Sequence, residues 1–286
     1  MTETGGVGAG AGAGAEDAVA PSAMSAATIE PLAGGWRLLS HDAVTSTNDV
    51  AKRLAREGAA HGTVVAARRQ EAGRGRRGRS WSSPEGNVYA SVVLRPGMPA
   101  DQAAQLSFVA AVATAQALGD LLPGDLPVRC KWPNDVLIDG AKVSGILLET
   151  ETGPAGGIEW IVLGIGINVL HHPEPAAGDT GYPVTSLAAR GATQTDPRNV
   201  LGAVVEAFRT WYGRWMAQGF APVRANWLAA AYGIGGPVTV RLEHATLHGR
   251  FAGLDADGAL LLERDGAAIH RIKAGDVFFG IRSEGD

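Results

Sequence analysis

Residues 70–81 read Gln-Glu-Ala-Gly-Arg-Gly-Arg-Arg-Gly-Arg-Ser-Trp. With Arg68 and Arg69 included, six arginines fall within the twelve residues 68–79, against a single acid, Glu71. Glycine lets the backbone adopt conformations that a Cβ forbids and approach a ligand closely. Arginine carries a permanent charge and forked donors that match a carboxylate or a phosphate. This arginine–glycine loop (residues 70–81) is therefore predicted to close over an anion.

Three other interpretations of the loop are weighed against this one. Glycines 73, 75 and 78 also fit the G-x-G-x-x-G dinucleotide fingerprint, with Thr63–Arg69 as the strand, but that fingerprint needs a helix directly afterwards. Residues 79–86 have no helical period and contain Pro84. A nucleic-acid patch needs a basic surface that continues beyond the loop, whereas the whole chain has a net charge of −4. A solvated basic surface loop is the third alternative.

Length and composition set the broad class of protein. The 286 residues suffice for one large domain and one small one. No apolar run is long enough to span a bilayer, and the absence of Lys or Arg before Arg37 argues against a secretory signal. The single cysteine, Cys130, excludes an internal disulfide and suits a reducing cytoplasm, where we expect it to be a small buried side chain.

The chain divides into three parts by composition. Residues 1–33 are mostly Gly, Ala, Ser, Thr and Glu, with few large apolar side chains, and are expected to be a disordered tail. Residues 34–232 mix strand-like runs with helical patterns and are expected to form an α/β domain. Residues 233–286 contain short strand-like runs separated by Gly and Asp turns, which predict a small β-barrel.

Three polar segments accompany the loop. Thr45–Asn48 begins a predicted helix, where Thr47 or Ser46 either caps the helix, which is the simpler interpretation, or grips a neutral ligand. Lys131–Asp135 ends a strand, and Lys142–Gly145 and Gly164–Asn168 follow it. Together these segments offer several fixed cations, few nucleophiles and no metal-ligand cluster. That combination suits a reaction between two anions, such as a carboxylate attacking the α-phosphate of a nucleotide, because positioned positive charge offsets their repulsion.

In order and spacing, the motifs from Val44 to Asn168 resemble those of biotin protein ligases: Ser46-Thr47-Asn48, Gln70-x-x-Gly73-Arg74-Gly75-Arg76-Arg77-Gly78-Arg79-x-Trp81, Lys131-Trp132-Pro133-Asn134-Asp135, Lys142-x-x-Gly145-Ile146-Leu147-x-Glu149 and Gly164-x-Gly166-Ile167-Asn168. The resemblance implies an α+β fold: a class II aminoacyl-tRNA synthetase-like catalytic domain, with a mixed sheet and helices, followed by a C-terminal SH3-like β-barrel. It also implies that biotin and ATP are the substrates of a first step that forms biotinyl-5′-AMP, with Mg²⁺ on unassigned ligands. A lysine of a biotin carboxyl carrier domain, from acetyl-CoA/acyl-CoA or pyruvate carboxylase, then accepts the biotin.

The resemblance also implies roles for individual residues. Ser46, Thr47 and Gln70 would hydrogen-bond the ureido head of biotin, with Asn48 supporting that pocket. The remaining biotin contacts would come from Gly73, Arg74, Gly75, Arg76, Lys142 and Gly145. The nucleotide side would be lined by Arg77, Arg79, Trp81, Lys131, Asn134, Asn168 and Arg282. The catalytic roles would fall to Arg76 as the lid cation, Lys142 at the reacting oxygens, and Asp135 at the incoming lysine.

Repressor-type members of the family carry an N-terminal helix-turn-helix that this sequence lacks, so we expect no operator binding. We also expect no membrane partner, and a monomer or weak homodimer. Two rival functions are a lipoate ligase and a non-catalytic biotin sensor. A lipoate ligase lacks the dense arginine loop followed by Lys-Trp-Pro-Asn-Asp. Lys142 and Asp135 favour an enzyme over a sensor.

Overall fold

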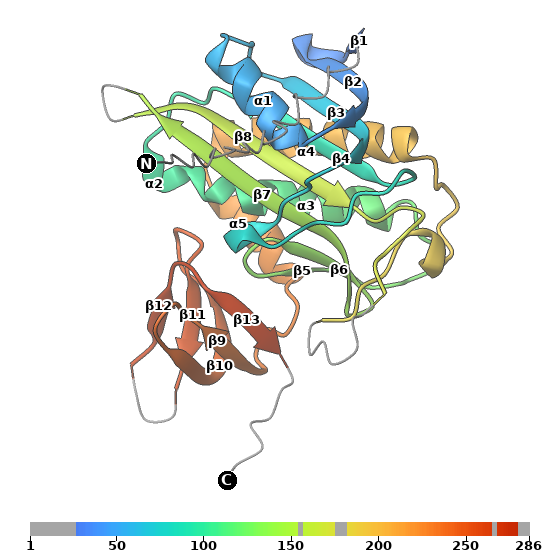
Figure 1. The fold of residues 1–286 in the computed structure, drawn as a ribbon. Helices are drawn as coiled ribbons and strands as arrows, with labels where there is room; N and C mark the ends of the chain where they lie inside the picture. The colour runs from blue at the N-terminus through green and yellow to red at the C-terminus, as the bar shows by residue number, and fades with distance from the viewer. Residues whose placement is uncertain (1–26, 154–156, 175–181, 265–267, 280–286) are drawn as a thin grey trace, which may run out of the picture.

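The computed structural model describes residues 27–153, 157–174, 182–264 and 268–279. These residues form two sheets (Figure 1): a large one in the order β1-β2-β3-β4-β8-β7-β6-β5, and a C-terminal one in the order β12-β11-β10-β9-β13. Helices pack on the large sheet. The expected α+β class, a mixed sheet with helices followed by a C-terminal β-domain, is confirmed.

The large sheet is mixed because one of its pairs is parallel. β2 and β3 run parallel, joined by helix α1 (Thr47–Arg56), and the other pairs are antiparallel. A parallel pair needs such a crossover, which places the start of α1 beside the end of β3. The strands are β1 (Thr28–Pro31), β2 (Arg37–Val44), β3 (Thr63–Gln70), β4 (Val88–Leu94), β5 (Val128–Lys131), β6 (Asp135–Ile138), β7 (Ala141–Thr152) and β8 (Ile158–Ile167).

Helices cover both faces of the large sheet (Figure 1). On one face α1 buries Val50 and Ala51 against β3, β4 and β8. On the other face lie α2 (Ala100–Ala103), α3 (Gln105–Gly119), α4 (Pro197–Gln218) and α5 (Ala221–Ala229). The aromatic side chains of α4 are part of the core: Trp211 and Trp215 are buried, and each donates its indole N–H to a glutamine of α3.

Strand β1 corrects the predicted tail. Residues 28–31 pair antiparallel with β2, with Ile29 opposite Leu39, and a short 3-10 turn (Ala33–Gly35) follows. The prediction of disorder through residue 33 was therefore wrong at its end. Composition does not reveal that the free edge of β2 supplies backbone hydrogen-bond partners, or that Glu30 pairs with Arg198 of α4 at 2.5 Å. Residues 1–26 lie outside the described part of the chain.

Strands β7 and β8 are the two longest strands of the large sheet, and they pair through two glycines. Glycine weakens a strand, so a glycine at this position in each strand needs another reason. Gly145 of β7 lies opposite Gly166 of β8 in the sheet. A Cβ on Gly166 would lie 2.7 Å from Cε2 of Trp81, so this glycine pair allows an indole to lie directly on the sheet.

The C-terminal sheet contacts the large domain through the motif that precedes Asp135. It consists of β9 (Pro237–Arg241), β10 (Thr246–Leu254), β11 (Leu260–Glu263), β12 (His270–Ile272) and β13 (Asp276–Phe279). Trp132 is 1% exposed and donates its indole N–H to the Gly258 carbonyl at 3.2 Å. Its neighbour Cys130 is fully buried, as predicted, and burial raises the pKa of its thiol to about 12. Among the described helices, none has the length and apolar character needed to cross a bilayer.

Candidate active site

A cleft lies on the large sheet beneath the arginine–glycine loop and extends to β13 of the C-terminal sheet. Its floor is backbone of β7 and β8, including the Gly145–Gly166 pair. The predicted site residues that line it are Ser46, Thr47, Asn48, Gln70, Arg74, Gly75, Arg76, Arg79, Trp81, Lys131, Asn134, Asp135, Lys142 and Gly145. Segments far apart in the sequence therefore form one site.

One end of the cleft is neutral and rich in hydrogen bonds. Thr47 donates to the Gln70 carbonyl oxygen Oε1 twice, from its backbone N–H at 2.8 Å and from its hydroxyl, which lies 3.1 Å away. Gln70 in turn donates its amide to the Ser83 hydroxyl at 2.9 Å. Ser46 occupies the N-cap position of α1 but makes no side-chain cap hydrogen bond. The simple capping interpretation was therefore wrong: the Thr47 hydroxyl donates to Gln70 instead, and both Ser46 and Thr47 line the cleft.

Ser91, which the sequence analysis missed, connects two of these side chains. Its fully buried hydroxyl lies 2.8 Å from the Thr47 hydroxyl and 2.6 Å from Oδ1 of Asn48. Asn48 donates its amide to Glu149 at 2.7 Å, so both polar atoms of Asn48 have protein partners. Asn48 therefore supports the pocket wall, and the only sequence signal for Ser91 is a polar residue within an apolar strand.

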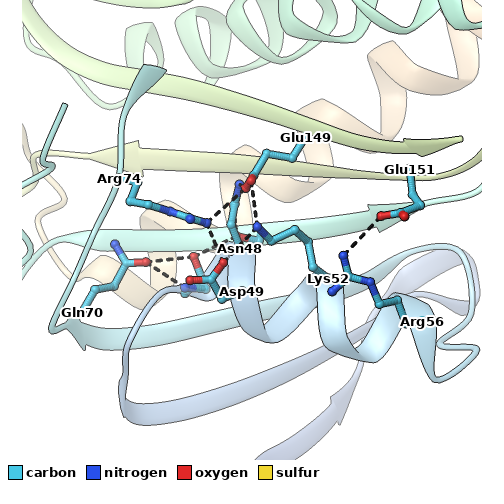
Figure 2. Close-up of polar contacts among 10 residues, drawn as sticks. Asn48, Asp49, Lys52, Arg56, Gln70, Arg74, Glu149 and Glu151 are labelled. Atoms are coloured by element: carbon cyan, nitrogen blue, oxygen red, sulfur yellow. Dashed lines mark hydrogen bonds and ion pairs between the residues drawn. The ribbon is translucent and has the colours of Figure 1, made fainter. Parts of the chain in front are cut away.

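Carboxylates hold three of the four arginines of the loop. Arg74 lies 2.5 Å from Asp49 and 3.4 Å from Glu149, as Figure 2 shows. The other two paired arginines, Arg77 and Arg79, both reach Oδ2 of Asp276 at the start of β13, at 3.1 and 2.5 Å. The loop is therefore fixed to α1 and β7 at its beginning and to the C-terminal sheet at its end.

Arg76 is the exception among the loop arginines. It lines the cleft and donates to Oδ1 of Asn134 at 3.3 Å, and no carboxylate within the described residues forms an ion pair with it. Burial lowers the pKa of its guanidinium, an effect that the nearby charge of Asp276 opposes. A partly desolvated arginine without an anionic partner is suited to binding an anionic ligand.

Two lysines that line the cleft flank one carboxylate. Lys142 Nζ lies 2.6 Å from Asp135 Oδ1, and Lys131 Nζ lies 3.7 Å from Oδ2. Burial raises the pKa of Asp135, but the attraction of Lys142 and Lys131 outweighs it and places that pKa below its ordinary value. Burial lowers the pKa of Lys131, whose ammonium lies 4.3 Å from the ring centre of Tyr182. The three side chains carry a net positive charge at the cleft.

Sequence models of two families match the chain. The biotin/lipoate A/B protein ligase family matches residues 37–229, and the biotin protein ligase C-terminal domain matches residues 233–280. The chain belongs to the biotin protein ligase family. A biotin–[acetyl-CoA-carboxylase] ligase of Paracoccus denitrificans is 44% identical over 82% of this chain and 97% of its own length. The bifunctional ligase/repressor BirA of Bacillus subtilis is 36% identical over 86% of this chain and 75% of its own.

Solved structures of the family share the fold. A biotin protein ligase from Aquifex aeolicus, in complex with biotin and ATP, superposes with a TM-score of 0.71 at 28% identity, covering 85% of this chain and 97% of that one. The resemblance to biotin protein ligases drawn from the sequence motifs is thus confirmed.

Of the predicted site residues that the structure describes, three do not line the cleft. Gly73 supports the loop by accepting the N–H of Trp81 at 2.9 Å. Arg77 is held by Asp276 outside the lining. Asn168 is 2% exposed and donates its amide to the Thr185 carbonyl. Arg282 lies outside the described residues.

The cleft also contains ligase residues that sequence reasoning missed. Tyr182 and Phe278 line it near Lys131, with ring centres 6.5 Å apart and nearly parallel planes. Burial raises the pKa of Tyr182 to about 12, and its hydroxyl accepts the N–H of Phe279. The third residue of this kind is Asp276, which binds Arg77 and Arg79. No recognisable sequence motif surrounds these residues. Only the packing of β13 against the arginine–glycine loop shows that they line the cleft.

Proposed function

We propose that this cleft carries out the two half-reactions of a biotin protein ligase, with ATP as the activating nucleotide. One observation carries the proposal: a neutral hydrogen-bonding pocket at Thr47 and Gln70 shares a cleft with Arg76 and with the lysine pair around Asp135. The neutral end suits the uncharged ureido ring of biotin. The charged end suits the biotin carboxylate and the nucleotide phosphates.

In the first half-reaction, a biotin carboxylate oxygen attacks the α-phosphorus of ATP, and the bond to pyrophosphate breaks. Both reactants are anions, so their repulsion opposes the approach. Lys142, with its side chain 25% exposed, and Arg76 supply positive charge at this place. A single well-placed donor of this kind typically contributes about 3–4 kcal/mol to transition-state stabilisation.

In the second half-reaction, a lysine ε-amine attacks the acyl carbon of biotinyl-5′-AMP, the amide bond forms and AMP leaves. Asp135 is the carboxylate that the incoming lysine meets, and its pKa lies below the ordinary value. A carboxyl group with a low pKa is a weak base, but it stays ionised near neutral pH and accepts hydrogen bonds as a charged carboxylate. We therefore assign Asp135 to orienting the lysine nitrogen and attracting its proton.

Magnesium receives no protein ligands in this proposal. The described residues contain no cluster of His, Cys, Asp or Glu side chains that could hold a metal ion. Two carboxylates line the cleft, Asp135 and Asp276, and each is already bound by two cationic side chains. These residues do not fit a dedicated magnesium site, so Mg²⁺ is expected to enter on the ATP phosphates.

Biotin-dependent exchange of pyrophosphate into ATP tests the first half-reaction, with lipoate as the control acid. We expect exchange with biotin and none with lipoate. Transfer is then measured as mass added to a biotin carboxyl carrier domain, with its acceptor lysine replaced by arginine as the control. Folded protein that supports no exchange with biotin, ATP and Mg²⁺ would overturn the proposal.

A further inference from the structure

Arg74 is held by carboxylates that lie away from the reacting groups. Its Nη2 atom lies 2.5 Å from Asp49 in the first turn of α1 and 3.4 Å from Glu149 of β7. Figure 2 shows the guanidinium of Arg74 pointing at this pair, on the α1 side of the loop. Two carboxylates for one guanidinium leave it little capacity to bind a further anion.

Glu149 joins the loop to the wall of the biotin pocket. Its Oε2 atom accepts from the Asn48 amide at 2.7 Å and also lies 3.4 Å from Arg74, while Oε1 accepts from Lys52 at 2.8 Å. Lys52 also lies 3.0 Å from Asp49. Arg74, Lys52, Asp49 and Glu149 therefore form one cluster without net charge. Oε2 of Glu149 also accepts from the Asn48 amide, and Asn48 is connected to Thr47 through the Ser91 hydroxyl.

We propose that Asp49 and Glu149 are positioning residues that act through Arg74, anchoring the start of the arginine–glycine loop so that it retains the acyl-adenylate. The inference rests on the proposed function for the identity of that ligand. Arg74 serves as the anchor of the loop, and Arg76, two residues later, is left to face the ligand. The shared oxygen of Glu149 links the ureido end of the pocket to closure of the loop.

A plain surface ion pair is the competing interpretation, because such pairs commonly contribute little to stability. The cluster differs in its burial and its sharing of partners. The side chains of Lys52 and Glu149 are 18% and 28% exposed, those of Arg74 and Asp49 are 39% and 41% exposed, and Glu149 accepts from three donors. A matched ordinary pair lies beside it: Arg56, four residues after Lys52, binds Glu151, two residues after Glu149, at 3.2 Å (Figure 2). Arg56 and Glu151 are 60% and 44% exposed.

The test compares Asp49→Asn and Glu149→Gln with the control Glu151→Gln in the full chain. The first measurement is the rate at which trypsin cleaves the ligand-free protein after arginines 76, 77 and 79, read by mass spectrometry. The second is the rate at which biotinyl-5′-AMP formed in the cleft is released. We expect Asp49→Asn and Glu149→Gln to raise both rates about three- to tenfold, the effect of losing a partly buried ion pair. Glu151→Gln should leave both unchanged.

A double-mutant cycle separates anchoring from a general structural effect. In an Arg74→Gln background, Asp49→Asn should add nothing to either rate, and Asp49→Glu in the wild-type background should keep release slow. Wild-type rates in Asp49→Asn, or an unchanged effect of Asp49→Asn after Arg74 is replaced, would overturn the anchor. Failure of the proposed function is seen separately, as absent biotin-dependent exchange in the wild type, and the trypsin measurement does not depend on it.

Discussion

Lys142 and Asp135 form a close ion pair in the cleft, with Nζ and Oδ1 2.6 Å apart. The cation assigned to the first half-reaction therefore holds the carboxylate assigned to the second. Lys131 lies 3.7 Å from the other oxygen of Asp135, so the carboxylate keeps a counter-charge when Lys142 turns to the phosphates. Because the two groups share one ion pair, replacing either should affect both half-reactions, but to different extents.

Lys142→Ala should slow adenylation much more than it weakens biotin binding. The ammonium matters most where phosphate charge develops, and losing one such donor typically costs about 10²- to 10³-fold in rate. Pyrophosphate exchange measures the rate, and calorimetry measures biotin affinity in the absence of ATP. Lys273→Ala, outside this cleft, is the control lysine. Equal losses in exchange and in biotin affinity would contradict the assigned role.

Asp135→Asn should impair transfer more than adenylation. The amide keeps the shape of the side chain but presents no charge to the incoming ammonium. Because the pKa of Asp135 lies below its ordinary value, the carboxylate is ionised across the neutral range. In the wild type, single-turnover transfer should therefore rise with pH as the acceptor lysine loses its proton, without a break from Asp135 near neutrality. A titrating step that disappears in Asp135→Asn would show that Asp135 acts as a base of near-neutral pKa.

The same pKa shift predicts a loss of stability in acid. A carboxyl group whose pKa is lower in the folded state stabilises the protein above its unfolded pKa, and that stability is lost as pH falls through the folded value. The direction of the shift at Asp135 places this window below its ordinary value of 3.8. Urea unfolding should show wild type more stable than Asp135→Asn at pH 6, with the difference shrinking as pH falls below about 4. A difference independent of pH would argue against the ion pair.

Most of the residues singled out in the sequence line one cleft, but the sequence did not reveal the contacts that arrange them. Thr47, Gln70, Arg76 and Asp135 could be predicted because their residue types in those motifs fit the chemistry and the family. Ser91 could not, since a serine within an apolar strand gives no sign of which side chains it faces. Asp276 comes from a sheet almost 200 residues after the loop, and such a pairing depends on tertiary packing alone.

The fold shows the same division between local and tertiary signals. Asp196 caps α4 by accepting the Arg198 N–H at 2.9 Å, and a cap of this kind can be predicted from a few adjacent residues. The pairing of Gly145 with Gly166 inside two strands could not be predicted in this way, because glycine lowers the intrinsic preference for a strand. Their reason for being glycine is an indole that approaches from a loop about 65 to 85 residues earlier in the chain, which no local pattern contains.

Arg76→Gly should release the adenylate faster while leaving the fold intact. Arg76 is the loop arginine without a carboxylate partner among the described residues, so its removal leaves no buried anion uncompensated. Losing a charged hydrogen bond to a ligand typically costs about 1.5–3 kcal/mol, or roughly 10- to 100-fold in retention. Arg68→Gly, which removes the exposed pair between Arg68 and Glu85, is the matched control. Equal retention of biotinyl-5′-AMP by Arg76→Gly and wild type would rule out Arg76 as the lid cation.

Gly166→Ala should weaken adenylation without destabilising the protein. The new Cβ would lie 2.7 Å from Cε2 and 2.8 Å from Nε1 of Trp81, closer than packed atoms tolerate, so the indole must leave the sheet. Alanine itself suits a strand better than glycine, so unfolding free energy should stay equal or rise. Exchange kinetics should show a higher KM for ATP and biotin, and the fluorescence of Trp81 should report its displacement.

Gly202→Ala is the control for this substitution, since no atom lies within 4 Å of its added Cβ. It should stabilise α4 by up to about 1 kcal/mol and leave exchange unchanged. Gly145→Ala, whose Cβ would lie 3.0 Å from Cζ3 of Trp81, should fall between the two. The order Gly166→Ala, Gly145→Ala, Gly202→Ala in lost activity follows from steric overlap with one side chain. A Gly166→Ala enzyme with normal KM values would mean that Trp81 does not need to rest on the glycine pair to close the pocket.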